Sequence, residues 1–211
     1  MEEFKFEYGG LEIVFLKHAG FMVKGSKTLY IDPYDLPKDA ELDTADYILI
    51  THDHFDHLDF DAIKKLSGTN TTVVIPQGCS IKGETTCTLG LNEKTDLNGI
   101  TVETVPAYNI EKEFHPKAHE YVGYIITMDG VTVYHAGDTD HTSELECVSS
   151  DVALIPVGGK FTMNIDEAKK VIEKINAKYV IPMHYDTFPD IETDVSKLKS
   201  EKVVLLKPMF S

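Results

Sequence analysis

Arginine is absent from this chain of 211 residues, and all 20 of its basic residues are lysine. Its 35 acidic residues produce a formal net charge of −15 and an isoelectric point of about 4.9. Bidentate phosphate binding and the reading of base edges depend heavily on arginine, and an acidic surface repels a polyanion. The composition therefore argues against nucleic acid as a partner, while a small anionic substrate held by a lysine stays compatible with it.

Cysteine is scarce as well. The three cysteines, Cys79, Cys87 and Cys147, form no C-x-x-C pair, and an odd number does not suit the disulfide framework of a small secreted protein. We expect reduced thiols in a cytoplasmic protein. The alternative is a disulfide between Cys79 and Cys87 across a hairpin.

Long apolar runs are also missing, since none approaches the roughly 18 residues that a membrane span needs. The N-terminal stretch, residues 1–5, is charged rather than apolar. We therefore expect neither an export signal nor membrane insertion.

What the chain has instead is a series of short strands. They are rich in aliphatic and β-branched residues, and turn-forming residues separate them. The dipeptide Asp129-Gly130 is a strong hairpin signal between two of them. The predicted strands cover residues 11–16, 20–24, 28–32, 47–51, 72–76, 100–106, 122–128, 131–135, 152–157, 179–183 and 203–206.

Helices are fewer. A short one is predicted after Asp59 as its N-cap, and a clearer one after Asn164, which with Glu167 resembles a capping box. A third is predicted near residues 194–199. The pattern indicates α and β structure with sheets dominant, and no repeat or linker interrupts it, so we predict one domain over residues 1–211.

The most informative segment is residues 51–57, Thr-His-Asp-His-Phe-Asp-His, directly after an apolar strand. Neutral imidazole and ionised carboxylate are the ligands that zinc, manganese and iron accept. Four such side chains in so short a stretch predict a metal site, made of His52, His54, Asp56 and His57.

The spacing H-x-H-x-D-H resembles the metallo-β-lactamase superfamily, in its small single-domain UlaG-like (ascorbate-6-phosphate lactonase-like) branch. Later segments resemble further motifs of that branch, namely residues 105–109, 114–117, 134–140 and 181–185. The resemblance implies an α/β (α+β) fold, a four-layer αββα sandwich in which loops at one edge of the sheets assemble one or two metals.

By the same resemblance, His52 and His54 would bind a first metal. Asp56, His57 and His184 would bind a second, and Asp138 would bridge the two. Asp56, Asp138 and His115 are the predicted catalytic residues. The simpler readings are a turn aspartate for Asp138 and a core histidine for His184.

The third ligand of the first site is open. The family usually has a histidine where this chain has Asn109, and an amide oxygen is a poor zinc ligand. His115 is the next candidate, either as a ligand or catalytic group or as a lid histidine that contacts only substrate. His119 is a further candidate.

Groups around the ligands can also be predicted, because metal-bound histidines usually donate their second nitrogen to a carboxylate or carbonyl. Asp32 is expected to orient a ligand, His18 to lie at the rim or serve structure, and His135 to pack in the core. The expected substrate contacts are Lys117, Lys160 and Tyr185, and backbone N–H groups of residues 157–163 could receive an anion.

These residues predict a hydrolase that uses a metal-activated hydroxide on a small-molecule ester, lactone or phosphoester. The expected cofactor is one or two divalent metal ions, zinc first, with manganese or iron as alternatives. The alternative functions are a metal-dependent nuclease or phosphodiesterase, a non-hydrolytic di-iron redox protein, and a binding protein that has lost activity. Substrate identity and a homo-oligomeric state stay open.

Overall fold

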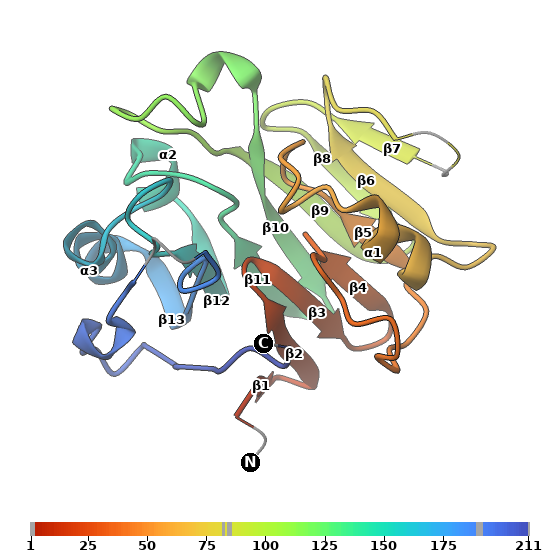
Figure 1. Ribbon diagram of the computed structural model, residues 1–211, viewed down its shortest axis with the longest axis horizontal. Helices are drawn as coiled ribbons and strands as arrows, with labels where there is room; N and C mark the ends of the chain where they lie inside the picture. The colour runs from red at the N-terminus through yellow and green to blue at the C-terminus, as the bar shows by residue number, and fades with distance from the viewer. Residues whose placement is uncertain (1–2, 82, 84–85, 189–191, 211) are drawn as a thin grey trace.

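The first half of the chain forms a seven-stranded sheet in the computed structural model, which describes residues 3–81, 83, 86–188 and 192–210 (Figure 1). Its strands follow one another in space as they do in sequence, from β1 to β7. The strands are β1 (Lys5–Tyr8), β2 (Leu11–Lys17), β3 (Gly20–Lys24), β4 (Thr28–Ile31), β5 (Tyr47–Leu49), β6 (Thr72–Pro76) and β7 (Thr86–Leu89). The first four are antiparallel and the last four run parallel.

The second half forms a six-stranded sheet in the order β13-β12-β11-β10-β9-β8. Its strands are β8 (Lys94–Leu97), β9 (Ile100–Pro106), β10 (Val122–Met128), β11 (Val131–His135), β12 (Ser149–Pro156) and β13 (Asn176–Met183). Strands β11, β12 and β13 are parallel, so their carboxyl ends meet at the same edge.

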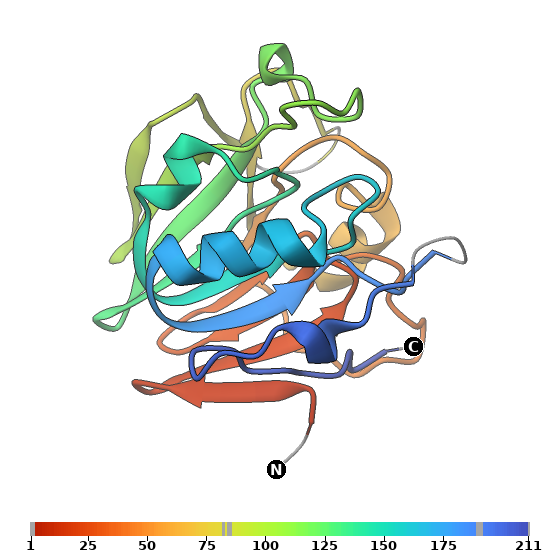
Figure 2. The same ribbon diagram turned by 90° about the vertical axis from the view of Figure 1, so that its left-hand side faces the viewer.

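The two sheets pack face to face with helices outside, as Figures 1 and 2 show. The largest cluster of buried apolar residues lies between the sheets. Helix α1 (Phe60–Leu66) covers the outer face of the first sheet, while α2 (Ser143–Glu146) and α3 (Ile165–Lys174) cover the second. Because each sheet and helix buries one apolar face, the result is the predicted αββα sandwich.

Local signals specify the two longer helices. Asp59 accepts hydrogen bonds from the first turn of α1, and Asn164 and Glu167 form a complete capping box at α3. The hairpin of β10 and β11 turns at Asp129 and Gly130, both with positive φ, as the sequence predicted.

Several predictions at the margins were wrong. The prediction omitted the strands β1, β7 and β8 and the short helix α2. Residues 203–206 form no strand beyond a single bridge between Val203 and Val180, and the helix expected near 194–199 is one 3₁₀ turn, Val195–Lys197. The omitted strands have four residues each and bury at most one of them, so their sequences contain too few buried apolar positions to show a period.

The three cysteines, Cys79, Cys87 and Cys147, are free thiols in the structure. Within the residues that the structure describes, no helix has the length and apolar character needed to cross a membrane.

One edge of the sandwich gathers the loops that carry the predicted site. The loop after β5 holds residues 51–57, the loop after β11 holds Asp138, and His184 directly follows β13. Hydrogen bonds join the sheets there: the His184 N–H donates to the His18 carbonyl (2.8 Å) and the Val122 N–H to the Thr51 carbonyl (3.2 Å). The packing of the sheets therefore brings distant segments together at this edge.

Candidate metal centre

The buried carboxylate of Asp32 organises the histidine motif. Its Oδ1 accepts from the Thr51 N–H (2.8 Å), and its Oδ2 accepts from the Thr51 hydroxyl (2.6 Å) and lies 2.7 Å from Nδ1 of His57. Since Nδ1 of His57 faces a carboxylate, it carries the proton, and Nε2 is left as a lone-pair donor. Asp32 therefore orients His57, as the sequence predicted of it.

Asp138 lies among three histidines from three different loops. Its Oδ1 is 3.4 Å from Nε2 of His57, and its Oδ2 is 3.2 Å from Nε2 of His115 and 2.9 Å from Nε2 of His184. All four side chains are buried. The expected convergence of Asp138 and His184 on the motif is thus present in the fold.

Three overlapping groups of ligand atoms lie close enough to hold a metal, each with its atoms within 4.8 Å of one another. One contains His52, His54 and His115. The second contains His18, Asp56, His57 and His184. The third contains His52, His57 and Asp138. These groups contain every metal ligand that the sequence predicted, together with His18.

Several buried atoms of this cluster have no hydrogen-bond partner. They are Nε2 of His57, Nε2 of His115, both ring nitrogens of His184 and Oδ1 of Asp138. Although three of these nitrogens approach Asp138, none does so with hydrogen-bond geometry. An unpaired buried polar atom is costly, and a bound cation would satisfy all the atoms that point to the centre. The donor set therefore fits a divalent metal.

His115, rather than Asn109, meets the two motif histidines. The Asn109 side-chain oxygen accepts from the backbone N–H of His115 (3.1 Å) and lies 3.0 Å from its Nδ1. The Asn109 amide group donates to Asp140 (3.1 Å) and to the Phe161 carbonyl (3.0 Å). Asn109 thus supports the ring of His115 and turns Nε2 toward Asp138.

His18 belongs to the site, a choice that the sequence left open. Its Nε2 lies 3.0 Å from Oδ2 of Asp56, and its Nδ1 lies 3.0 Å from the Thr187 hydroxyl. The ring of His18 also packs against that of His184, with centroids 3.9 Å apart. His18 therefore holds one oxygen of Asp56 in place.

The carboxylates of the cluster are held in the charged form. Burial opposes this, yet the charges of His184 and His57 hold the pKa of Asp138 well below its usual range. Burial likewise works against Asp56, but its hydrogen bond to His18 lowers the pKa of the carboxyl below its usual value. Ionised carboxylates are the form that binds a cation.

The histidines divide into two kinds. Burial, with the charge of His57, lowers the pKa of His52 well below its usual value, and burial with His184 lowers the pKa of His18 to about 4. Burial would lower the pKa of His57 too, but the carboxylates of Asp138 and Asp32 raise it well above the usual value. The same two carboxylates would also favour a bound cation beside His57.

Backbone strain is concentrated at the same edge. His18 (φ 59°), Asp32 (φ 45°) and His184 (φ 58°) all adopt the left-handed region, which is uncommon for residues other than glycine. Such strain persists only where surrounding contacts enforce it, and it clusters at functional sites.

Gly158 leaves room for the backbone of His184. A Cβ at position 158 would stand 2.2 Å from the His184 carbonyl oxygen. We expect Gly158→Ala to displace His184 and to weaken metal binding about tenfold or more, measured by calorimetric metal titration.

Gly159→Ala is the matched control for that substitution. Its Cβ would meet nothing closer than 3.6 Å, so only the left-handed backbone (φ +81°) is strained, at a cost of about 1–2 kcal/mol. Equal metal affinity in the Gly158 variant and the unmodified protein would contradict the role given to this glycine.

Other predicted groups lie away from the cluster. Lys117 pairs with Glu144, and the Tyr185 hydroxyl donates to the Leu206 carbonyl, so each of these predicted substrate contacts has a partner within the protein. His119 contacts the Tyr121 hydroxyl, and His135 is a packed histidine bonded to the Ala19 carbonyl, as expected for His135.

The anion site expected at residues 157–163 is not formed as predicted. The side chain of Asn164 already accepts from the first N–H groups of α3, and the N–H groups of Gly159 and Lys160 donate to carbonyls of Met163 and Gly158. These donors are used inside the loop, because a helix that carries its own N-cap has fewer amides to offer.

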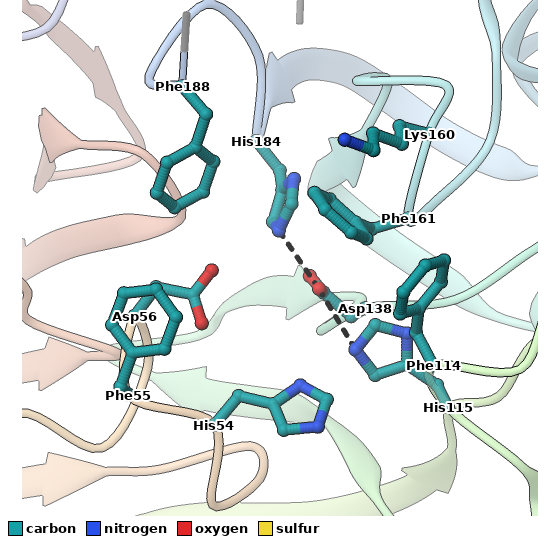
Figure 3. A pocket seen from close by; sticks show the side chains of 10 residues that line it. All are labelled: His54, Phe55, Asp56, Phe114, His115, Asp138, Lys160, Phe161, His184 and Phe188. Atoms are coloured by element: carbon teal, nitrogen blue, oxygen red, sulfur yellow. Dashed lines mark ion pairs between the residues drawn. The ribbon is translucent and has the colours of Figure 1, made fainter. Parts of the chain in front are cut away.

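A cavity of about 390 Å³ opens beside the cluster (Figure 3). Its polar lining includes His54, Asp56, His115, Asp138 and His184, together with Lys160 at the upper right of the view. Its apolar lining, which the sequence analysis missed, is Phe55, Phe114, Phe161 and Phe188. The available signal was that each phenylalanine lies within a few residues of a motif histidine, aspartate or lysine.

Comparisons with known proteins agree with this geometry. The model of the Beta-lactamase superfamily domain matches residues 12–184. A UPF0173 metal-dependent hydrolase from Pyrococcus abyssi is 36% identical over 94% of this chain and 97% of its own length.

Solved structures show the same similarity. A candidate metal-dependent hydrolase from Parabacteroides distasonis superposes with a TM-score of 0.80 at 29% identity, covering 97% of this chain and 98% of its own. Igni18, a metallo hydrolase from Ignicoccus hospitalis, has a TM-score of 0.77 at 27% identity, covering 94% and 95%.

Fold, ligand cluster and relatives together define the class, a metal-dependent hydrolase. The chain belongs to the metallo-β-lactamase superfamily. The predicted family, fold and enzyme class are confirmed, whereas the UlaG-like branch, the metal and the roles of single residues stay predictions.

Proposed function

We propose that this protein hydrolyses a small-molecule ester, lactone or phosphoester with one or two divalent metal ions held at the sandwich edge. His52, His54 and His115 would hold the first ion. Asp56, His57 and His184 would hold the second, and Asp138 would reach both. The observation that carries the proposal is the set of buried, unpartnered nitrogens of His57, His115 and His184 around Asp138 at the base of a cavity.

A divalent ion bound at this place would polarise the carbonyl or phosphoryl group of the substrate and would lower the pKa of a water molecule enough for attack near neutral pH. Zinc suits the histidine-rich first group best, while the carboxylates of the second group suit manganese or iron as well. Metal analysis of the purified protein distinguishes these alternatives.

The chain's own residues would orient the reacting water. Asp56 lines the cavity, and His18 holds one of its oxygens at 3.0 Å. The carboxylate is thereby turned to a defined direction, in its charged form, where it would accept a hydrogen bond from water. Asp138 lies across the cavity base from Asp56 and would restrict the same water from the other side.

The cavity also limits what reaches these groups. Its size is near the lower end of the roughly 300–1,000 Å³ typical of small-molecule sites. Together with the acidic charge of the chain and its lack of arginine, this favours a small substrate over a nucleic acid.

The ligand assignment is tested by a pair of variants. We expect His115→Ala to lose one bound metal, because it removes the third nitrogen of the His52 and His54 group. We expect Asn109→Ala to keep the metal but to bind it about 10–100-fold more weakly, because it removes only the support of the His115 ring. Elemental analysis and competition with a chromophoric chelator measure both quantities.

His119→Ala is the control, since His119 lies outside the ligand groups found in the described residues. It should leave metal content unchanged. Loss of a metal in Asn109→Ala but not in His115→Ala would reverse the assignment. Turnover is then measured with each metal added back, using a panel of esters, lactones, phosphoesters and thioesters.

A further inference from the structure

Two aromatic walls face each other across the ligand cluster. Phe55 and Phe188 form one wall, with ring centroids 6.2 Å apart, and Phe114 and Phe161 form the other, with centroids 4.6 Å apart. Figure 3 shows one pair on each side of His184 and Asp138. Any molecule that approaches these two residues through the cavity passes between phenyl rings.

Each aromatic wall has one phenylalanine that is exposed to solvent and one that is half-buried. Phe55 is 69% exposed and Phe114 is 44% exposed, although both are large apolar side chains. Neither belongs to the buried clusters that hold the sheets and helices together. Apolar side chains that gather at the mouth of a cavity, rather than singly over a surface, indicate a binding site.

The polar groups of the cavity are segregated. The histidines and carboxylates lie at its base, and the lining formed by the described residues also includes the side chain of Lys160. The Lys160 ammonium lies 5.2 Å from the ring centroid of Phe161, which places a positive charge beside an aromatic wall. A substrate that contacts the wall at this point would bind more tightly if it carried a negative charge near the Lys160 ammonium.

We propose that the substrate is an ester or lactone with an aromatic or similarly bulky apolar group that fits between the phenylalanine walls, and with an anionic substituent near Lys160. This proposal rests on the proposed hydrolytic function and names its substrate class. The walls have no hydrogen-bond partners for sugar hydroxyls, so a polyhydroxylated lactone would lose hydration without compensation.

The reaction is a balanced hydrolysis. The oxygen of one water molecule bonds to the acyl carbon, and the acyl carbon–oxygen bond to the leaving group breaks. One proton of that water goes to the leaving oxygen, which becomes an alcohol or phenol; an ester releases it as a separate molecule, whereas an opened lactone keeps it in the same molecule. The acid product releases the other proton to solvent. No oxidant, reductant or further reactant is required.

Turnover tests the substrate class. Dihydrocoumarin and glucono-δ-lactone serve as aromatic and polyhydroxylated lactones, with each kcat/KM divided by the uncatalysed rate constant. We expect this quotient to be at least about tenfold larger for dihydrocoumarin. Phe114→Ala/Phe161→Ala should lower the ratio of the dihydrocoumarin quotient to the glucono-δ-lactone quotient about tenfold.

The anionic substituent is tested with 4-acetoxybenzoate against phenyl acetate, again relative to the uncatalysed rates. Lys160→Gln should lower the preference for 4-acetoxybenzoate about threefold to fivefold. Phe60→Ala is the matched control, because Phe60 is 58% exposed but lies at the start of α1, outside the cavity lining. It should change none of these values.

Binding provides a readout that needs no turnover. Saturation-transfer NMR with 3-phenylpropanoate and gluconate, on protein stripped of metal, should show binding of the first alone, lost in Phe114→Ala/Phe161→Ala. Equal binding of both, or binding that the double variant does not affect, would overturn the inference whatever the activity. Selective aromatic binding without turnover of any ester or lactone, with any metal, would instead overturn the proposed function and the substrate assignment with it.

Discussion

Asp138→Asn is expected to remove bound metal and to lower the rate of hydrolysis by about 1,000-fold or more. The carboxylate lies between His57, His115 and His184, and an uncharged amide is a poor replacement for it. A metal contributes several kcal/mol of transition-state stabilisation, and about 4 kcal/mol corresponds to about 1,000-fold in rate. Metal content by elemental analysis and kcat/KM on the best substrate measure the effect.

Asp53→Asn is the matched control for this substitution. Asp53 is part of the same motif, but it is exposed and accepts from the Tyr121 hydroxyl rather than facing the centre. It should keep both metal and activity. Circular dichroism should show both variants folded, because Asp138 contributes to the site rather than to the apolar core. Full metal content in Asp138→Asn would exclude Asp138 as a ligand.

Asp32→Asn should reduce the free energy of unfolding by about 2–4 kcal/mol. The single buried carboxylate satisfies the Thr51 N–H, the Thr51 hydroxyl and the His57 ring, and an amide places an N–H group against donors. Asparagine tolerates the left-handed backbone at this position (φ 45°), so the variant isolates the loss of charge. We expect the melting temperature to fall by about 5–15 °C.

The same variant should bind metal about 10–100-fold more weakly, because His57 loses the partner that sets its tautomer and orientation. Asp43→Asn is the control: Asp43 makes an exposed ion pair with Lys24, so stability should change by less than about 1 kcal/mol. A melting temperature of Asp32→Asn within error of that control would show that the buried network is not needed for folding.

Sequence reasoning succeeded where the relevant physics is local. The caps at Asp59 and Asn164 act within one helical turn, and the strands next to them alternate or run apolar because their faces are buried. It failed for β1, β7 and β8, which are short strands at or near the edges of the sheets with exposed or half-exposed residues. A four-residue strand with one solvent-exposed face has too few apolar positions to show the two-residue period of a strand.

The candidate site divides in the same way. The residue types and spacing of His52, His54, Asp56 and His57 lie within one loop, so their joint use could be predicted from the chain alone. The choice between Asn109 and His115 as the third ligand could not be predicted from the chain alone. It depends on how the loop after β9 folds back. In the folded loop Asn109 supports the ring of His115, a pairing that a linear pattern does not show.

The amino-acid pattern was enough to establish a metal-binding motif and α and β structure with sheets dominant, because short-range spacing specifies caps, turns and adjacent ligands. The two-sheet architecture was expected only from the resemblance of the motifs to a known family. The place of His18 beside Asp56, the choice of His115 and the pairing of phenylalanines from four loops emerged only after the sheets were packed. The physical reason is that the distances between loops at the sandwich edge depend on how two sheets bury their shared apolar face, which no local segment encodes.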